Sequence, residues 1–478
     1  MTRAQEDRRW AALIVLCTGM LMIILDSTIV NVALPSIQSD LHFSESNLAW
    51  VVNAYLITFG GLLLLAGRLG DLIGRRTIFL AGLAVFTLAS LVCGTAQSQE
   101  ALVVARFAQG AGGALTSSVI LGIIVTMFPG EGEQAKAIGV FSFVASAGAS
   151  IGLLAGGVLT QAIDWHWIFF VNIPIGIATA VLALRLVERD RGIGFEKGAD
   201  APGALLVTSA LMLGVYTILK AGDYGWGSAR TLGFGAIAVS LLAGFVARES
   251  RAAHPLVPLS IFRSRNVSGA NAVQMLAVGA VFGMFFLAVL YMQRVLGYSA
   301  VATGFAFLPV SGLIGLFSLG FSARLSLRYG AKTIVVPGLV LMTAGLALLT
   351  RVPVDGSYVT DLLPSMVLLG AGAGLFFPSL TTIAMSGVEP SEAGLASGLL
   401  NQSLQVGGSI GLAVLATLSA THTDTLVAQG ESVHAALTGG YTLAFVIAAV
   451  LAGVATAVAA SVLRPESRFS EVAYSNAG

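Results

Sequence analysis

The chain has 478 residues, of which 56% are hydrophobic and 10% are charged, and its formal net charge is +1. A soluble domain carries about 25% charged residues, so this composition and a mean hydropathy of +0.88 exclude a soluble protein and indicate an integral membrane protein. The small net charge gives no indication of a nucleic-acid partner.

Segments of about 20 mostly apolar residues are long enough to cross a bilayer as helices. The first begins at Trp10, is too long for a signal peptide and is followed by no small-residue cleavage site, so we expect a retained helix. The sequence therefore predicts an all-α integral membrane protein with fourteen transmembrane helices. In chain order they are 10–33, 48–67, 77–96, 100–125, 137–161, 166–186, 202–220, 230–247, 267–291, 303–322, 333–350, 361–385, 394–419 and 438–462.

The basic residues predict which side of the membrane each loop occupies. With the N-terminus in the cytoplasm, twenty of the 25 Lys and Arg residues fall in cytoplasmic segments, four fall outside, and Arg106 falls within a span. Cytoplasmic loops carry an excess of Lys and Arg, and an odd number of spans would remove the asymmetry found here. Both termini are therefore expected in the cytoplasm.

Two loops look like diverged copies of each other, GRLGDLIGRR at residues 67–76 and ARLSLRYGAK at residues 323–332. Repeated halves with a binding site near the membrane midplane are typical of secondary transporters. We therefore expect two six-helix bundles, residues 1–190 and 263–478 with its short cytoplasmic tail, and two helices inserted within residues 191–262. The matching pairs are Arg68 and Arg324, Leu69 and Leu325, Gly74 and Gly330, and Arg76 and Lys332.

Several motifs resemble those of the major facilitator superfamily, in particular its fourteen-span drug:proton antiporter-2 branch. They are GRLGDLIGRR, LDSTIVNVALP (25–35), WVVNAYLIT (50–58), LVVARFAQGAGGA (102–114), WHWIFFVNIPIG (165–176) and GLASGLLNQSLQVGGSIGLA (394–413). The resemblance implies a monomeric multidrug or antibiotic efflux protein of the bacterial plasma (inner) membrane. It also implies transport driven by the proton motive force, with no cofactor, and with an amphipathic small molecule, protons and membrane lipids as partners.

Four positions depart from this family pattern. Leu153 stands in place of the proline of the fifth-span motif, which weakens any argument that a proline kink prevents proton leak. Leu404 and His166 stand where the family often has arginine, and Leu327 stands where a second copy of Asp71 would be expected. The glycines of the fifth-span motif keep their spacing: Gly139, Gly148, Gly152, Gly156 and Gly157.

Asp26 is the acidic residue that we place deep within a predicted helix, and Arg106 is the basic one. Asp26 lies about 12 Å from the external end of the first span, and Arg106 lies about 9 Å from the external end of the fourth. The two charges are at similar depth, so each would offset the other's desolvation if these spans pack together. The resemblance to the superfamily implies that both spans surround one cavity.

We expect Asp26 to be the proton-coupling site, with Arg106 as the partner that keeps it ionised when no proton is bound. An ionised acid at the centre of a lone membrane helix costs about 2.5–3.5 kcal/mol on insertion scales, and such groups usually mark ion or substrate routes. Burial opposes ionisation of a carboxylate whereas a nearby cation favours it, so such a site could load a proton outside and release it inside. The alternative is a purely structural ion pair.

The loop after the second span contains charges and glycines that the resemblance identifies as a conformational latch on the cytoplasmic side. A carboxylate at Asp71 could bridge to the basic groups and to a neighbouring helix N-terminus. For Arg76 a role in membrane orientation alone is the alternative, but that role fits Asp71 poorly, because acidic residues contribute little to orientation. The latch residues are Gly67, Asp71, Gly74, Arg75 and Arg76.

Gly148, Gly152 and Gly156 lie four residues apart on one face of the fifth span, and Gly157 follows them. Small residues at this spacing let helices approach closely. Two interpretations stay open, namely close packing alone and a moving interface between the two halves.

Uncharged polar residues and a tyrosine inside the spans are candidates for the lining of the substrate cavity. For some of them the alternative is an interhelical hydrogen bond, worth about 0.6 kcal/mol on average. Phe285, Phe286, Phe376 and Phe377 could add aromatic walls suited to lipophilic cations. The candidates are Asn31, Asn53, Tyr55, Gln109, Asn172, Asn271, Gln274, Asn401 and Gln405.

We expect a proton-coupled exporter of lipophilic or cationic drugs or antibiotics that works by alternating access. A transporter of one defined metabolite, lipid or nutrient, by symport or export, is the alternative, and the glycine spacing favours export. An ATP-driven pump, a receptor or an enzyme is not expected, since the sequence has no G-x-x-x-x-G-K-[ST] loop, no soluble domain and no H-E-x-x-H motif. No metal site is predicted, because the five histidines are scattered.

Overall fold

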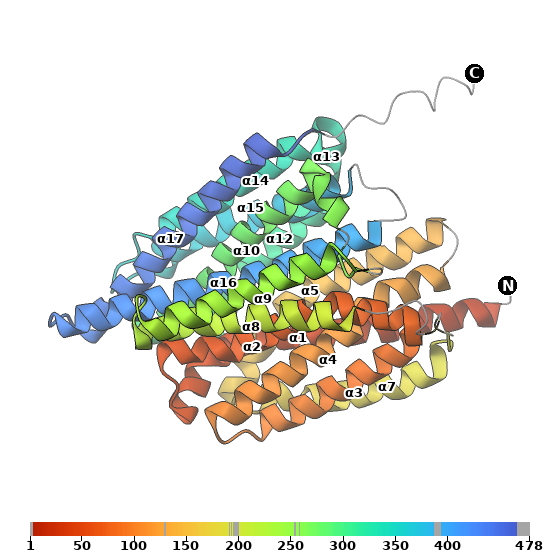
Figure 1. The fold of residues 1–478 in the computed structure, drawn as a ribbon. Coiled ribbons are helices and arrows are strands. Elements are labelled where there is room, and N and C mark those ends of the chain that lie inside the picture. Colours follow the sequence, from red (N-terminus) through yellow and green to blue (C-terminus); the bar gives the residue numbers. More distant parts are fainter. Residues whose placement is uncertain are drawn as a thin grey trace.

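The computed structural model describes residues 3–128, 131–190, 192, 194, 200–252, 255–257, 259–386 and 393–465, and every regular element in them is helical. The N-terminal helices, red to yellow, form one bundle, and the C-terminal helices, green to blue, form another (Figure 1). The two bundles lie close together at the left of the view and diverge toward the right, where α1 begins and α17 ends.

The N-terminal bundle holds seven helices within the described residues. Ser44 and Ser98 cap α2 and α4, because their side chains accept hydrogen bonds from the Asn47 and Ala101 N–H groups, both at 3.2 Å. α4 packs against α2 and α3, and α1 packs against α5, α7 and α4. The helices are α1 (Arg3–Leu41), α2 (Glu45–Ile73), α3 (Arg75–Gly94), α4 (Gln99–Met127), α5 (Glu131–Ala162), α6 (Trp167–Phe170) and α7 (Asn172–Leu186).

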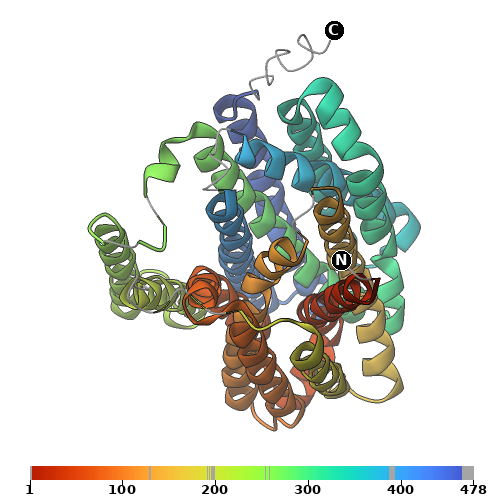
Figure 2. The ribbon, with the colours of Figure 1, turned by 90° about the vertical axis from the view of Figure 1, so that its right-hand side faces the viewer.

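Two helices lie between the bundles in the chain, α8 (Ala201–Tyr224) and α9 (Ala229–Glu249). α8 packs against α2 of the N-terminal bundle and α16 (Ala393–Ala428) of the C-terminal bundle, and α9 packs on α8. Figure 2 shows this pair at the side of the molecule. The inserted helices therefore flank the contact between α2 and α16.

The C-terminal bundle contains several broken helices. α11 ends at Ala306 and α12 begins at Leu308, where Pro309 occupies an early helical position that suits proline. The elements are η2 (Leu259–Arg263), α10 (Arg265–Leu290), η3 (Tyr291–Val295), α11 (Ala300–Ala306), α12 (Leu308–Leu316), η4 (Phe317–Ser322), α13 (Ala323–Tyr329), α14 (Ala331–Leu349), η5 (Tyr358–Leu362), α15 (Leu363–Met385), α16 and α17 (Val433–Val462).

Eleven helices of the described residues are long and apolar enough to cross a membrane, and α2, which bends by 49° between Leu63 and Leu65, would be a twelfth. α5 and the broken series α11 to α13 are not among them, so fourteen spans stays a prediction. The structure confirms the coarser expectation of an all-helical, multi-pass membrane fold.

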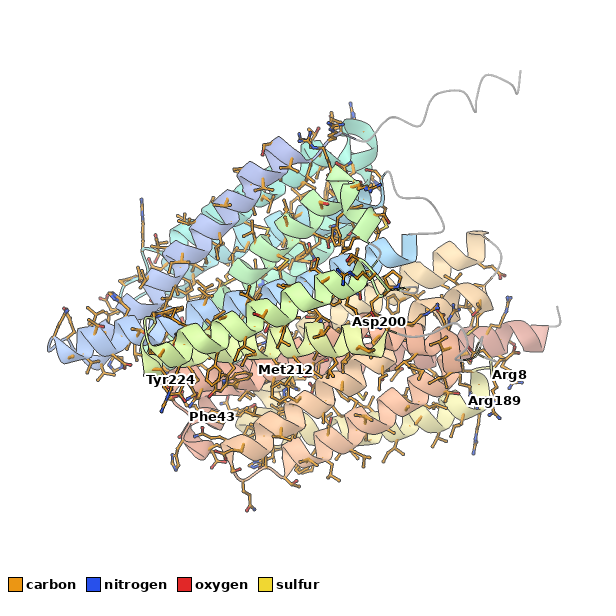
Figure 3. All side chains as sticks on the ribbon, viewed as in Figure 1. Arg8, Phe43, Arg189, Asp200, Met212 and Tyr224 are labelled. Carbon is orange, nitrogen blue, oxygen red and sulfur yellow. The ribbon has the colours of Figure 1, made fainter. Side chains whose placement is uncertain are left out.

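The two ends of the molecule carry different side chains. Arg8 and Arg189 lie at the end where α1 begins, and Phe43 and Tyr224 lie at the opposite end (Figure 3). These four residues thus lie at the ends that match their predicted sides of the membrane (Figure 3).

The two copies of the repeated loop share a glycine conformation and a hydrogen bond from a basic residue to the end of a helix. Gly74 joins α2 to α3 with φ +116°, and Gly330 joins α13 to α14 with φ +86°, both in the left-handed region that favours glycine. Arg76 donates a hydrogen bond of 2.6 Å to a carbonyl at the end of α7, and Lys332 donates one of 2.7 Å to a carbonyl at the end of α17. In each half, the matching basic residue caps the last helix, where free carbonyls and the helix dipole favour a cation.

Candidate transport site

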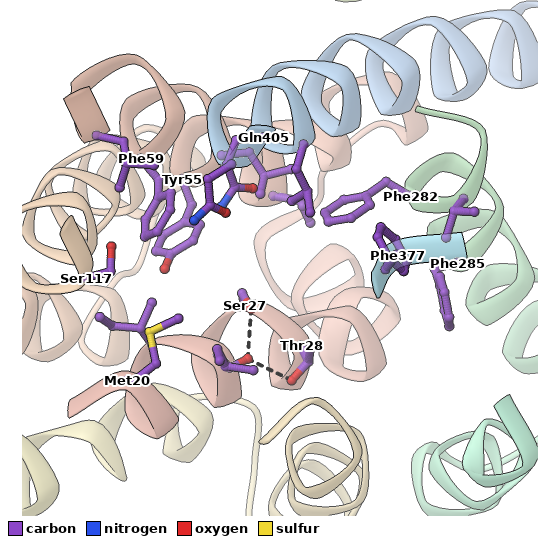
Figure 4. A pocket seen from close by; sticks show the side chains of 18 of the residues that line it. Met20, Ser27, Thr28, Tyr55, Phe59, Ser117, Phe282, Phe285, Phe377 and Gln405 are labelled. Carbon is purple, nitrogen blue, oxygen red and sulfur yellow. Dashed lines mark hydrogen bonds between the residues drawn. The ribbon is translucent and has the colours of Figure 1, made fainter. Parts of the chain in front are cut away.

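A cavity of about 690 Å³ lies between the two bundles, within the size range of small-molecule sites. Its walls come from α1, α2, α4 and α5 on one side and from α10, α12, α15 and α16 on the other. Tyr55 and Phe59 of the N-terminal bundle lie across from Phe282, Phe285 and Phe377 of the C-terminal bundle (Figure 4). The cavity is therefore a place where a molecule would contact both halves.

Four of the nine predicted cavity residues line it, and five do not. Asn53, for example, accepts a hydrogen bond of 2.9 Å from Ser409 across the contact between α2 and α16. The sequence of an apolar span gives little information about which of its side chains face a cavity, because the helix has no distinct polar face. The lining residues are Asn31, Tyr55, Asn401 and Gln405. The prediction is corrected for the five that lie elsewhere: Asn53, Gln109, Asn172, Asn271 and Gln274.

Asp26 and Arg106 are in direct contact inside the N-terminal bundle. Arg106 Nη1 donates to Asp26 Oδ2 at 2.6 Å, and the two side chains are 1% and 0% exposed. Arg106 Nε also donates to the Val51 carbonyl at 2.8 Å, and the guanidinium lies 4.5 Å from the centre of the Tyr55 ring. A buried ion pair offsets its desolvation only when its remaining donors and acceptors are also satisfied. Here Arg106 Nε and Nη1 and both carboxylate oxygens of Asp26 have hydrogen-bond partners.

Two amides and a hydroxyl complete the polar surroundings of the carboxylate. Gln109 and Asn172 donate from their amide nitrogens to Asp26 Oδ1 at 2.7 and 2.8 Å. Gln109 Oε1 accepts from Arg106 at 2.7 Å, and Gln109 Nε2 also donates to Ser90 Oγ at 2.9 Å. Ser90 was not expected here, because a serine in an apolar span carries no sequence signal of its own. Its hydroxyl connects the two amides.

The ion pair lies behind the cavity wall and not on it. Ser27 and Asn31 of α1 line the cavity, whereas Asp26 points into the N-terminal bundle toward α3, α4 and α7. The resemblance implies that the spans of Asp26 and Arg106 surround one cavity, and residues of α1 and α4 do line it, but the side chains of Asp26 and Arg106 do not. The physical reason is that the acceptors and donors that satisfy the pair lie inside the bundle. Tyr55 connects the two regions, because its side chain lines the cavity and its ring covers Arg106.

The predicted latch residues join helices of the N-terminal bundle. Arg75 donates to Asp71 Oδ1 from Nε at 3.2 Å and from Nη2 at 3.0 Å, and from Nη1 to the Gly122 carbonyl of α4 at 2.9 Å. Gly67 faces Ser118 of α4, and both Ser118 and Gly122 also line the cavity. The cavity thus reaches the latch cluster.

Asp190, which follows α7, holds the start of α3. Its carboxylate accepts hydrogen bonds from the Arg75 N–H at 2.6 Å and the Arg76 N–H at 3.1 Å. Such contacts satisfy the free N–H groups at a helix start. We expected Asp71 to approach a neighbouring helix N-terminus, and the structure shows Asp190 there instead. Gly74 is required beside it, since a Cβ at this position would stand 2.9 Å from the Asp190 carbonyl.

Asp190→Ala is expected to lower the free energy of unfolding by about 1 kcal/mol, because two N–H groups at the start of α3 lose their acceptor. Denaturant or thermal unfolding of the purified protein measures this change. The matched control is Glu188→Ala, an exposed acid two residues away, which should stay within about 0.5 kcal/mol of the unaltered chain. Equal losses in both variants would contradict the capping role.

Three glycines of the fifth-span motif pack against α1. A Cβ at Gly148 would stand 3.0 Å from the nearest atom of α1, and a Cβ at Gly156 would stand 2.7 Å from it. At Gly152 a Cβ would overlap a threonine of α1. Since α1 and α5 belong to the same bundle, these contacts favour the close-packing interpretation for the three positions. The side chains of Leu153 and Leu327 lie outside the described residues.

Gly157, by contrast, lies between the two halves. A Cβ there would stand 2.8 Å from the Ala300 carbonyl at the start of α11. Gln293 Nε2 donates to the Val32 carbonyl of α1 at 3.0 Å, also between the halves. These contacts hold the two bundles together near the end of the molecule opposite the latch cluster.

Gly157→Leu is expected to separate the bundles at this end, because a side chain has no room against α11. An Asn31→Cys reporter in the cavity should then react roughly tenfold faster with an impermeant maleimide added on the predicted external side. The native Cys17 and Cys93 are buried, so their reaction should be slow. The matched control is Val158→Leu, at a position that is 51% exposed. Unchanged labelling in Gly157→Leu would contradict a role in closing this end.

Comparison with known proteins extends these observations. Residues 16–412 match the family model described as Major Facilitator Superfamily. The puromycin resistance protein pur8 of Streptomyces alboniger is 41% identical over 446 residues, which cover 92% of this chain and 88% of that protein. The tetracenomycin C resistance and export protein of Streptomyces glaucescens is 38% identical over 417 residues, which cover 87% of this chain and 77% of that protein.

A solved structure has the same fold at much lower sequence identity. The crystal structure of a bacterial homolog of the human lysosomal transporter Spinster, in an inward-facing and unoccupied conformation, aligns with a TM-score of 0.69 and 16% identity. The alignment covers 95% of this chain and 96% of that chain. From the family match over most of the chain, together with a fold of two helical bundles around a cavity, the chain belongs to the Major Facilitator Superfamily of transporters.

Proposed function

We propose that this chain exports lipophilic or cationic drugs or antibiotics by alternating access, in exchange for protons that bind to Asp26. The observation that carries the proposal is a fully buried carboxylate, paired with a guanidinium at 2.6 Å and separated from a cavity by one tyrosine ring. Relatives named for resistance to puromycin and for resistance to and export of tetracenomycin C support export over uptake.

A proton on Asp26 would change how Arg106 is held. Neutral Asp26 no longer attracts the guanidinium by charge, whereas the Val51 carbonyl, Gln109 Oε1 and the Tyr55 ring keep their contacts with it. A change in the position of Arg106 would reach the cavity through Tyr55, because the Tyr55 ring covers Arg106 and the side chain lines the cavity. Binding of cargo and binding of a proton are linked in this way, and by reciprocity each alters the affinity for the other.

The proton motive force would supply the free energy. A proton that moves inward gains about 2.3 kcal/mol per 100 mV and about 1.4 kcal/mol per pH unit. For one proton, 100 mV and one pH unit, the sum corresponds to a gradient of roughly a few hundredfold for a neutral cargo. Exchange for a monovalent cation moves no net charge, so for such a cargo the pH unit alone would support a gradient of about tenfold. One carboxylate per molecule is therefore enough for export against a substantial gradient.

We further propose the fourteen-span topology of the drug:proton antiporter-2 branch, in a bacterial plasma (inner) membrane with both termini in the cytoplasm. The excess of basic residues in the predicted cytoplasmic segments supports this orientation. The matching build at Gly74 and Gly330 supports two repeated halves. The chain would act as a monomer without a cofactor, and the cluster of Asp71 and Arg75 would latch the cytoplasmic end.

The test is accumulation of a panel of lipophilic antibiotics in cells with and without this chain. We expect expression to lower accumulation, and a protonophore to abolish the difference, because it collapses the proton gradient. Efflux that persists after the gradient has collapsed would reject proton coupling. Unchanged accumulation across the panel would reject export of such compounds.

A further inference from the structure

We propose that the cavity selects cargo that is electrically neutral, with a hydrogen-bonding group at one end and an aromatic or alicyclic body at the other. This inference rests on the proposed export function and narrows its substrate class from lipophilic or cationic molecules to neutral ones. Three features of the cavity wall carry it, namely its charge, its aromatic rings and its free polar atoms.

The described part of the cavity wall carries no charge. No Asp, Glu, Lys, Arg or His is among the described residues that line the cavity. Two charged groups lie next to the wall, but each is paired already, Arg106 with Asp26 behind Tyr55, and Arg75 with Asp71 at the latch end. A charged cargo would lose its hydration without meeting a free opposite charge, which is strongly unfavourable in a low-dielectric interior.

Leu404 keeps one side of the wall uncharged. It lines the cavity on α16, at the position where the resemblance to the drug:proton antiporter branch implies an arginine in many members. A guanidinium there would face cargo directly, whereas the leucine presents an apolar surface. Its neighbours on the same wall, Asn401 and Gln405, are neutral amides. This chain therefore differs from the family pattern at the place where a cavity charge would be expected.

The aromatic rings of the wall do not replace a counter-charge. Phe282, Phe285 and Phe377 gather on the side formed by α10 and α15 (Figure 4). Cation–π attraction is one use of such rings, and Tyr would serve better than Phe. The ring of Tyr55, however, already covers the cation of Arg106 at 4.5 Å. The phenylalanines instead favour an apolar ring system by offset or edge-to-face contacts.

Polar atoms without a hydrogen-bond partner in the described part of the chain lie on the side of the cavity opposite the three phenylalanines (Figure 4). Tyr55 Oη, Ser117 Oγ and Gln405 Oε1 are buried and have no hydrogen-bond partner within the described part of the chain. Ser27 and Thr28 differ from them, because their hydroxyls donate to backbone carbonyls of α1 (Figure 4). Two hydroxyls and one amide oxygen match a neutral carbonyl or hydroxyl group of a cargo. Such a group would satisfy polar atoms that are costly to leave unpaired.

Triphenylphosphine oxide and methyltriphenylphosphonium are the matched probes. Both carry three phenyl rings, and they differ in a neutral P=O acceptor against a fixed positive charge. Equilibrium binding is measured with the purified full-length chain in zwitterionic nanodiscs, without a pH gradient. We expect a preference of roughly tenfold or more for the oxide. Leu404→Glu should reverse the preference, because it gives the cavity a carboxylate, and Leu404→Gln, of similar size but neutral, should retain it.

Equal or tighter binding of the phosphonium by the unaltered chain would overturn the proposal, and so would the absence of binding of either probe. A folded Leu404→Glu variant that still prefers the oxide would do the same. If Leu404→Glu does not fold, Ser311→Asp on another part of the wall replaces it, with the same reversal expected. The assay needs no proton gradient, so a preserved preference for the oxide together with failed proton-driven export would reject the proposed function alone.

Discussion

Asp26→Asn is expected to reduce proton-driven drug uptake by everted membrane vesicles to background, because asparagine cannot exchange a proton. The two carboxylate oxygens serve different partners, since Oδ2 accepts from Arg106 and Oδ1 accepts from Gln109 and Asn172. Asparagine has one acceptor oxygen, so either Arg106 or the two amides of Gln109 and Asn172 must lose their acceptor. Uptake of a labelled drug driven by an imposed pH gradient, normalised to the folded protein, is the measurement. Equilibrium binding of the drug should persist, because Asp26 does not line the cavity.

Stability must be separated from coupling, since Asp26→Asn leaves Arg106 buried without a counter-charge. Removing one partner of a buried ion pair costs about 3–5 kcal/mol. The double variant Asp26→Asn/Arg106→Gln removes both charges and should recover much of this free energy of unfolding, while proton-driven uptake stays absent. Recovery of uptake in the double variant would show that the pair is structural only. Asp223→Asn, which changes a partly exposed acid at the end of α8, is the control.

The fold class could be predicted because a bilayer constrains helices so strongly. Every backbone polar group in the hydrocarbon needs an internal partner, so long apolar segments must be helices. The repeated loop was also informative, because Gly74 and Gly330 both need a left-handed conformation and Arg76 and Lys332 both cap a last helix. Breaks such as the one before Pro309 were not predicted, since membrane helices tolerate proline and α15 continues through Pro378 without a break.

The depth of a residue in the membrane could be predicted from the sequence, but the direction in which its side chain points could not. Counting residues from the span ends placed Asp26 and Arg106 at similar depth, and they are in contact. The same count cannot show on which face of α1 the carboxylate lies. Asn31, five residues further along, lines the cavity, whereas Asp26 faces the bundle interior. The face is decided by partners from other helices, such as Asn172, which no local pattern identifies.

Contacts between segments that are distant in the chain could not be predicted from the sequence either. Asp190 caps α3 although it follows α7, and nothing near it in the sequence marks it as a helix cap. The glycine motif was more informative, because its i, i+4 spacing predicts a close helix contact. Which helix fills that contact is decided by the tertiary arrangement, and the structure shows α1 for Gly152 and α11 for Gly157.

Tyr55→Leu is expected to disconnect cargo binding from proton release, because the ring that lines the cavity and covers Arg106 is lost. A desolvated cation–π contact is worth about 2 kcal/mol or more, so its removal should change how cargo alters the ion pair. Addition of a neutral drug to the purified protein in weakly buffered detergent solution is expected to release protons, which a pH-sensitive dye detects. In Tyr55→Leu this release should fall to background while drug still binds, although more weakly.

Tyr55→Phe separates the two roles of the side chain. The phenylalanine ring can still cover Arg106, so drug-induced proton release should persist. The hydroxyl, which has no partner among the described residues, is gone, so binding of drugs with a carbonyl acceptor should weaken by roughly tenfold. Full proton release by Tyr55→Leu would show that cargo binding and proton release are connected by another route. One such route is α1 itself, because Ser27 lines the cavity and directly follows Asp26 in the chain. The pair of variants therefore distinguishes a link through the aromatic ring from a link through the helix that carries the acid.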